Sequence, residues 1–386
     1  MRVHLINNGY ALSAEFPMTA FEMQDALDRL KYPAGNSVVT FRIYEFKNMN
    51  LPSELYEKDF SADIYRFNLF AERLENLEFT EMAAFKSLLV ENPESSFEDM
   101  LLMTYGLDSV MVYPCGNCCE LGETVIENDM ISELESCSDE ILELLDREKV
   151  GKLMCEREGG QFIDGCYCLT SEYEKPDINI EIRRPDSCFF RLLIAQIKQN
   201  GVPDYGSARW ISLPLAIENQ GIDFENMTCV KSESSLPNLC QNQLQKEKIH
   251  ELNELARSLS ELSYDDFVKL KAVMESEQIH EISGVVDCIG RLDECEFDRN
   301  ISDSSEFGRT YLLKNIHKNF DFSAVEDMNL YDFGQVILER KQGEITSYGA
   351  ISGRDQELYS VMTVQPEQEL SGDLDEDENC EMGMSL

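Results

Sequence analysis

Cysteine residues are the first candidates for chemistry in this chain of 386 residues. Cys115, Cys118 and Cys119 lie close together, and Cys166 and Cys168 follow later in the same half. Thiolates at a Cys-x-x-Cys spacing can bind zinc. The second half has no equivalent cluster, so a fold that both halves share does not need the metal. We therefore interpret the thirteen cysteines as free thiols, as expected in a reducing cytoplasm.

Other reactive patterns are incomplete. The segment Asp373–Glu378 begins like a calcium-binding loop, but Glu378 stands where the loop needs glycine, and Met384 stands where it needs glutamate. The sequence contains no glycine-rich phosphate loop and no nucleophile elbow. The histidines are far apart in the sequence: His4, His250, His280 and His317. We therefore predict no catalytic residue, no cofactor and no metal site.

The strongest chemical signal is the excess of carboxylates. Asp and Glu number 74 against 33 Lys and Arg, which gives a formal net charge of −41. Such a chain repels DNA, RNA and anionic lipid, and it attracts basic surfaces such as nucleic-acid-binding clefts. No run of 18 apolar residues exists, and the N-terminus has no apolar core of signal-peptide length. These features predict a cytoplasmic protein that neither spans a membrane nor binds nucleic acid directly.

The carboxylates are predicted to gather on the outer faces of helices. The segment Asp139–Glu148 is predicted to be one helix that buries Ile141, Leu144 and Leu145 and carries acids opposite them, at i, i+4 and i+7. The predicted partner-binding acids are Glu72, Glu75, Glu133, Glu135, Asp139, Glu143, Asp146, Glu254, Glu261, Asp265, Asp293, Glu294, Glu296 and Asp298.

The elements that must hold these acids occur twice in the sequence. Two amphipathic helical stretches, Phe67–Leu77 and Leu252–Leu262, share an Asn, an Ala and two Leu at an offset of 185 positions. Further landmarks recur in the same order: Phe16-Pro17 and Leu213-Pro214, Asp108 and Asp293, Gly122 and Gly308, Gly151 and Gly334, Gly160 and Gly343. We predict two diverged copies of one module.

Each copy is predicted to combine a small sheet with helices, in an elongated α+β protein of several domains. Residues 1–178 form the first unit, residues 179–355 form the second unit, and residues 356–386 form an acidic, disordered tail. Thr19 and Thr80 are predicted helix N-caps. The predicted strands are Val3–Ile6, Val38–Phe46, Val110–Tyr113 and Phe189–Ala195, with hairpins Gly151–Cys155/Gln161–Cys168 and Gln335–Glu339/Glu344–Ala350.

Several motifs resemble the ArdA antirestriction family, most clearly between Ile249 and Ile351. They are Asn253-Glu-Leu-Ala256 with Leu259 and Leu262, Glu306-Phe-Gly308, Tyr331-Asp-Phe-Gly334, the Gly343 turn with Tyr348-Gly349, and the strand Thr40–Phe46. Members of that family are small acidic proteins of mobile genetic elements. They imitate bent B-form DNA and occupy the DNA-binding cleft of type I restriction–modification enzymes as elongated homodimers.

The resemblance implies a non-enzymatic antirestriction protein whose partner is a DNA-binding complex, such as the methyltransferase core of a type I restriction–modification enzyme. Because this chain carries two units, either a homodimer or a single-chain pseudo-dimer is expected. Two other functions stay open at this point. One is an acidic scaffold or chaperone for basic nucleic-acid-binding proteins, and the other is a carboxylate-dependent hydrolase.

Overall fold

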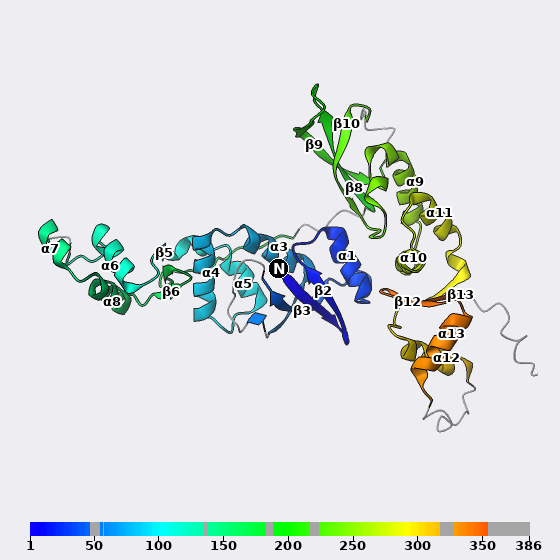
Figure 1. Ribbon diagram of the computed structural model, residues 1–386, viewed down its shortest axis with the longest axis horizontal. Helices are drawn as coiled ribbons and strands as arrows, with labels where there is room; N and C mark the ends of the chain where they lie inside the picture. Colours follow the sequence, from blue (N-terminus) through cyan, green and yellow to red (C-terminus); the bar gives the residue numbers. More distant parts are fainter. Residues whose placement is uncertain are drawn as a thin grey trace, which may run out of the picture.

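The computed structural model describes residues 1–46, 55–56, 58–134, 137–182, 188–215, 224–316 and 328–353. Within them the chain is an α+β protein of small antiparallel sheets and short helices, in an elongated and bent arrangement (Figure 1). The predicted fold class is therefore confirmed. The predicted tail, the calcium-like segment and Glu135 lie outside the described residues.

The first unit begins with a four-stranded sheet and continues through helices to a three-stranded sheet. Its strands are β1 (Arg2–Asn7), β2 (Tyr10–Glu15), β3 (Val38–Glu45), β4 (Asp59–Asp63), β5 (Met111–Tyr113), β6 (Gln161–Ile163) and β7 (Cys166–Leu169). Its helices are α1 (Ala20–Arg29), α3 (Ile64–Asn76), α4 (Phe79–Glu91), α5 (Phe97–Met103), α6 (Cys118–Glu127), α7 (Asp139–Leu144) and α8 (Arg147–Glu158).

The second unit repeats this order. Its strands are β8 (Phe190–Ile197), β9 (Pro203–Leu213), β10 (Met227–Ser234), β11 (Cys295–Asp298), β12 (Glu344–Thr346) and β13 (Gly349–Gly353). Its helices are α9 (Ile249–Ser260), α10 (Tyr264–Ser276), α11 (Ile282–Gly290), α12 (Ser304–Asn315) and α13 (Leu330–Arg340).

The two units have matching sheet topologies. The order β2-β1-β3 in the first unit corresponds to β9-β8-β10 in the second, and β5-β7-β6 corresponds to β11-β13-β12. β4 has no counterpart among the described residues, and the segment that would correspond to α1 lies outside them. The two predicted copies of one module are therefore present, whereas the exact limits of the units stay predictions.

A buried asparagine explains one repeated feature. Both Phe16-Pro17 and Leu213-Pro214 are cis peptide bonds. After the first, the Met18 backbone N–H donates to Asn68 Oδ1 at 2.6 Å, and after the second, the Leu215 N–H donates to Asn253 Oδ1 at 2.7 Å. Each asparagine thus satisfies a backbone donor at the same point of the fold, which ties the helix to the end of the strand.

Paired glycines explain another repeated feature, the tight contact between two helices. A Cβ at Gly151 would lie 1.9 Å from the Cys118 carbonyl oxygen, and a Cβ at Gly334 would lie 1.7 Å from the Ser304 oxygen. α8 therefore packs backbone to backbone on α6, as α13 does on α12. Only glycine permits this approach, since any side chain would overlap the facing carbonyl.

Several predicted element boundaries are wrong. Gly151–Cys155 and Gln335–Glu339 lie within helices α8 and α13, where Gly151 and Gly334 serve helix packing and not a turn. The hairpins are instead β6–β7 and β12–β13. Gly159 ends α8 with φ 72°, and the N-cap of α4 is Glu78 and not Thr80. By contrast, Thr19 caps α1 through a capping box with Glu22, as predicted.

A buried charge cluster joins the two units where α1 meets α10 (Figure 1). The Lys271 ammonium on α10 donates to Asp25 Oδ1 at 3.0 Å and to Asp28 Oδ2 at 2.8 Å on α1. The Tyr264 and Tyr348 hydroxyls donate to the same two carboxylates at 2.6 and 2.8 Å. A buried hydrogen-bonded network of this kind fixes how one unit sits on the other.

Candidate acidic interaction surface

The negative charge is spread unevenly along the chain. Residues 1–178 contain 35 Asp and Glu against 14 Lys and Arg, a formal charge of −21. Residues 179–355 contain 30 against 19, a charge of −11, and the remaining residues carry −9. The densest part is residues 72–158, with 22 acids against 6 bases, which we call the acidic arm. It includes the helices α4, α5, α6, α7 and α8, which extend away from the second unit (Figure 1).

Most of the predicted acids are exposed. Those with exposed side chains are Glu72, Glu75, Glu133, Glu143, Asp146, Glu254, Glu261, Asp265, Asp293, Glu294 and Glu296. Asp298 is half-buried, and the side chain of Asp139 lies outside the described part of the structure. The exposed members come from both units, so they form part of a surface that a partner can reach.

The predicted single helix over Asp139–Glu148 is wrong. α7 ends at Leu144, Leu145 has extended backbone dihedrals, and the Asp146 side chain caps the next helix, α8. Asp146 therefore does not share a helix row with Asp139 and Glu143. The predicted apolar face is also wrong, because Ile141 is 51% exposed and Leu144 is 86% exposed. A helix of six residues is too short to bury the predicted stripe.

Hydrogen bonds keep some carboxylates of the acidic arm ionised. Glu133 accepts two hydrogen bonds from the Arg157 guanidinium, at 2.9 and 2.7 Å, and these lower its pKa to about 2. The Lys149 backbone N–H lowers the pKa of Asp146. The Lys175 ammonium and the Ser96 hydroxyl lower the pKa of Asp99 to about 2. These groups keep their negative charge well below neutral pH.

The predicted surface acids of α3 and α9 are not repeated between the units. At the offset of 185 positions that relates α3 to α9, Glu72 corresponds to Arg257 and Glu75 corresponds to Ser260. In the other direction, Glu254 corresponds to Leu69. The surface charge has therefore diverged while the buried positions of the same helices have been kept.

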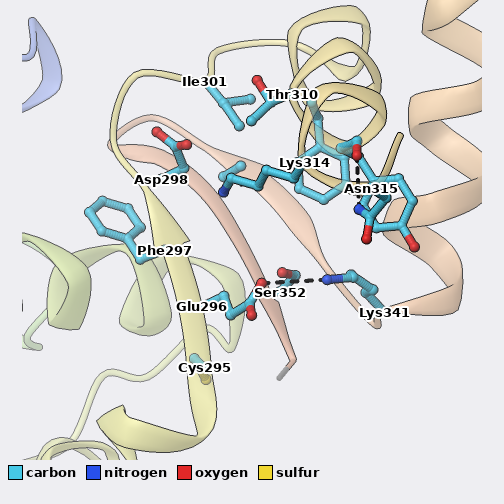
Figure 2. Close-up of a pocket in the computed structure, with 13 residues that line it drawn as sticks. Cys295, Glu296, Phe297, Asp298, Ile301, Thr310, Lys314, Asn315, Lys341 and Ser352 are labelled. Atoms are coloured by element: carbon cyan, nitrogen blue, oxygen red, sulfur yellow. Dashed lines mark hydrogen bonds and ion pairs between the residues drawn. The ribbon is translucent and has the colours of Figure 1, made fainter. Parts of the chain in front are cut away.

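Two of the predicted acids, Glu296 and Asp298, lie beside polar partners and a cavity. Glu296 lies 3.4 Å from the Lys341 ammonium, and Asp298 Oδ1 accepts a hydrogen bond from the Asn300 backbone at 3.1 Å. Both residues line a cavity between β11 and α12 (Figure 2). They consequently contribute less to an open acidic surface than the acids on α9 and α10 do.

The cysteine, histidine and carboxyl groups of the described residues do not come together as a metal site. Cys166 and Cys168 are buried in β7, and no group of His, Cys, Asp or Glu among those residues is arranged to hold a metal ion. In the described carboxyl groups whose pKa departs from its ordinary value, the pKa is lowered: Asp25, Asp59, Asp99, Glu133, Glu140, Asp146 and Asp303. A carboxylate-dependent hydrolase needs a general acid with a raised pKa, so this pattern gives that alternative no support.

Comparison of the chain with protein-family models and with curated proteins finds no match. Among the helices of the described residues, none has the length and apolar character needed to cross a membrane.

Proposed function

We propose that this protein is a DNA mimic that blocks the DNA-binding cleft of a type I restriction–modification enzyme or of a related DNA-targeting defence complex. The observation that supports this function best is the acidic arm. It contains 22 acidic and 6 basic residues, and those of its predicted acids whose side chains are described are exposed. The proposal also rests on the resemblance to the ArdA family. The protein would act in the cytoplasm, through binding alone, without a catalytic residue or cofactor.

The physical basis is replacement of phosphates by carboxylates. B-DNA carries one negative charge per about 1.7 Å of its axis, so the formal charge of −16 on the acidic arm equals that of a duplex about 27 Å long. A basic cleft that holds DNA would bind such a surface with release of counterions. The affinity should then fall steeply as the salt concentration rises.

The buried cluster between the units supports the same proposal. Lys271 pairs with Asp25 and Asp28, and Lys271 and Asp28 are almost completely buried, so the two acidic units keep a defined separation. A rigid ligand loses little conformational entropy when it binds. Two tandem units in one chain would span a length of cleft for which a one-unit protein needs two copies.

The test is binding to a purified type I methyltransferase core, with duplex DNA as competitor, over a range of salt concentrations. We expect competition by DNA and a linear fall of log affinity with log salt. The triple variant Glu123→Lys, Glu127→Lys, Glu143→Lys changes exposed acids of α6 and α7, and it should weaken binding about 10- to 100-fold. The matched control is Glu254→Lys, Glu261→Lys, Asp265→Lys on the less acidic second unit, with a smaller loss.

Two outcomes would reject the proposal. One is an affinity that added salt leaves unchanged. The other is equal retention of unrelated basic proteins without competition by DNA, which is the behaviour of an acidic scaffold or chaperone. Circular dichroism of each triple variant shows whether the fold is kept, so a loss of binding can be assigned to the changed charges.

A further inference from the structure

Two cysteine side chains meet where α6 packs on α8, in the acidic arm. The helices approach closely because Gly122 faces the Arg147 carbonyl and Gly151 faces the Cys118 carbonyl. A Cβ at Gly151 would lie 3.0 Å from the Cys118 α-carbon, so the two backbones nearly touch. The glycines thus permit a closer approach than the usual separation of about 8–10 Å between helix axes. Short side chains one turn away can therefore reach from one helix to the other.

Cys155 lies one helical turn after Gly151, on the same face of α8. The two helices run antiparallel, since Gly122 meets the start of α8 and Gly151 meets the start of α6. In a helix the Cα–Cβ bonds tilt toward the N-terminus. The Cys155 side chain therefore tilts toward Cys118, and Cys118, as the first residue of α6, tilts toward Cys155.

The two thiol groups interact with each other. Both the Cys118 thiol and the Tyr167 hydroxyl make a hydrogen-bonding contact with the Cys155 thiol, and burial raises the pKa of Cys155. The side chains of Cys118 and Cys155 are half-buried, whereas Cys115 and Cys166 nearby are buried. The pair is consequently within reach of a small reagent from the solvent.

The second unit has the same helix contact without the thiols. Ser304 holds the place of Cys118, because its carbonyl faces the contact glycine Gly334. Leu338, one turn after that glycine, holds the place of Cys155. The helix contact therefore does not require cysteine at either position, and packing alone does not explain the pair in the acidic arm.

We propose that Cys118 and Cys155 are a dithiol that a low-molecular-weight disulfide, such as glutathione disulfide, converts to a disulfide bond between α6 and α8. The Cys118 thiolate attacks one glutathione sulfur, which breaks the S–S bond and releases one glutathione. The Cys155 thiolate then attacks the Cys118 sulfur and releases the second glutathione. Two protein thiols are oxidised, one glutathione disulfide is reduced, and the two thiol protons pass to the released glutathione molecules. Cys118 attacks first, because burial disfavours the thiolate of Cys155.

This modification is separate from the proposed DNA mimicry, because neither thiol belongs to the acidic surface. Its effect is mechanical, since the bond would hold α6 against α8 and so keep the exposed acids Glu123 and Glu127 of α6 in one position relative to α8. Excess glutathione reverses the exchange and frees the two helices again.

The test is incubation of the full chain with glutathione disulfide, followed by blocking of the remaining thiols and peptide mapping by mass spectrometry without reduction. Trypsin releases Cys155 within Leu153–Arg157, apart from the other cysteines. We expect this peptide to be linked to the peptide that contains Cys118. We also expect excess glutathione to remove the link.

Three variants assign the link to its two cysteines. Cys118→Ser introduces the residue that the second unit has at this position, so it should fold, and it should lose the link. Cys155→Ser should lose the link as well. Cys119→Ser is the matched control, because it removes the neighbouring exposed thiol and should keep the link. Circular dichroism shows whether each variant is folded.

Three results would overturn the proposal. The first is absence of the link in the folded native chain, and the second is a link that persists in Cys118→Ser. The third is a lasting glutathione adduct on Cys118 in place of the link. In a reducing buffer, Cys118→Ser should bind the methyltransferase core as the native chain does, so this proposal and the proposed function fail separately.

Discussion

The two units of this chain share the residues that shape the backbone and differ in the residues that face solvent. Asn68 and Asn253 bind the same backbone group, and Gly151 and Gly334 permit the same helix contact. The exposed acids of α3, by contrast, have no acidic equivalents on α9. The buried positions of these elements have therefore been kept one by one, whereas on α3 and α9 the acidic character has been kept only as a net excess. Such a pattern is expected where function depends on an overall field.

A buried lysine that occurs in both units has different partners in each. Lys86 on α4 and Lys271 on α10 occupy equivalent positions and are both almost fully buried. Lys86 pairs with Asp164 in the β6–β7 turn of its own unit. In the second unit Ser347 holds the place of Asp164, and Asp25 and Asp28 of the first unit neutralise Lys271 instead. The second unit therefore relies on the first for a charge that its own fold no longer supplies.

The largest expected effect comes from Lys271→Met. This change leaves two carboxylates of α1 buried with less compensation, which costs about 3–5 kcal/mol in comparable buried pairs. It should also weaken the contact between the units. We expect scanning calorimetry to show two separated unfolding transitions in the variant, where the native chain shows one.

Lys86→Met is the matched control, because it removes the equivalent lysine without touching the contact between units. Its partner Asp164 is half exposed, so the loss of stability should be smaller and the single transition should be kept. If both variants unfold in one transition with equal losses, the second unit does not depend on the first in the way described.

The next largest effect is expected from alanine at the helix contacts. In Gly151→Ala and Gly334→Ala the new methyl group would overlap a carbonyl oxygen, so each helix pair must separate. Overpacking of this kind costs about 1–3 kcal/mol, and we expect similar values in the two units. Urea unfolding measures the loss. Gly290→Ala at the end of α11 is the control, because nothing lies within 4 Å of its Cβ position.

A smaller effect is expected from Asn253→Ala. The change leaves the Leu215 N–H and carbonyl without their side-chain partner, at a cost of about 1–3 kcal/mol in urea unfolding. Asn68→Ala should cost less, because its amide nitrogen donates to the exposed Glu72 and not to buried backbone. Exposed Asn76 on the same helix provides the control, since Asn76→Ala should have almost no effect. Equal losses at all three positions would show that the asparagines are not anchors.

The sequence predicted the repeat and the α+β class because the residues that recur are those with stringent geometric roles. Proline after an aromatic or leucine, buried asparagine and contact glycines recur in the same order, and the asparagines and glycines recur at offsets of 183 to 186 positions. The role of a glycine was nevertheless ambiguous. The sequence does not distinguish Gly151, which permits a helix contact, from a glycine in a hairpin turn, because it does not show which backbone faces the glycine. Short segments such as α7 were also misjudged, because six residues do not define a period.

The candidate site was less predictable than the fold. The exposure of acids such as Glu254 follows from the helical pattern. The charge cluster of Asp25, Asp28 and Lys271 could not be predicted in this way, because it joins residues of different units.

The smallest expected effect is a pH dependence of the contact between the units. Burial alone would raise the pKa of Asp25, but attraction to Lys271 and Arg29 and the hydrogen bond from Tyr348 outweigh it, so its pKa is lowered. A carboxyl group with a lowered folded pKa stabilises the native state above its unfolded pKa of about 3.9 and loses this contribution as the pH falls through the folded value. We therefore expect the melting temperature to drop below about pH 4, and to drop less in Asp25→Asn, which has no proton to take up at this position. A melting temperature with the same pH profile in both proteins would mean that this carboxylate does not link the units through its charge.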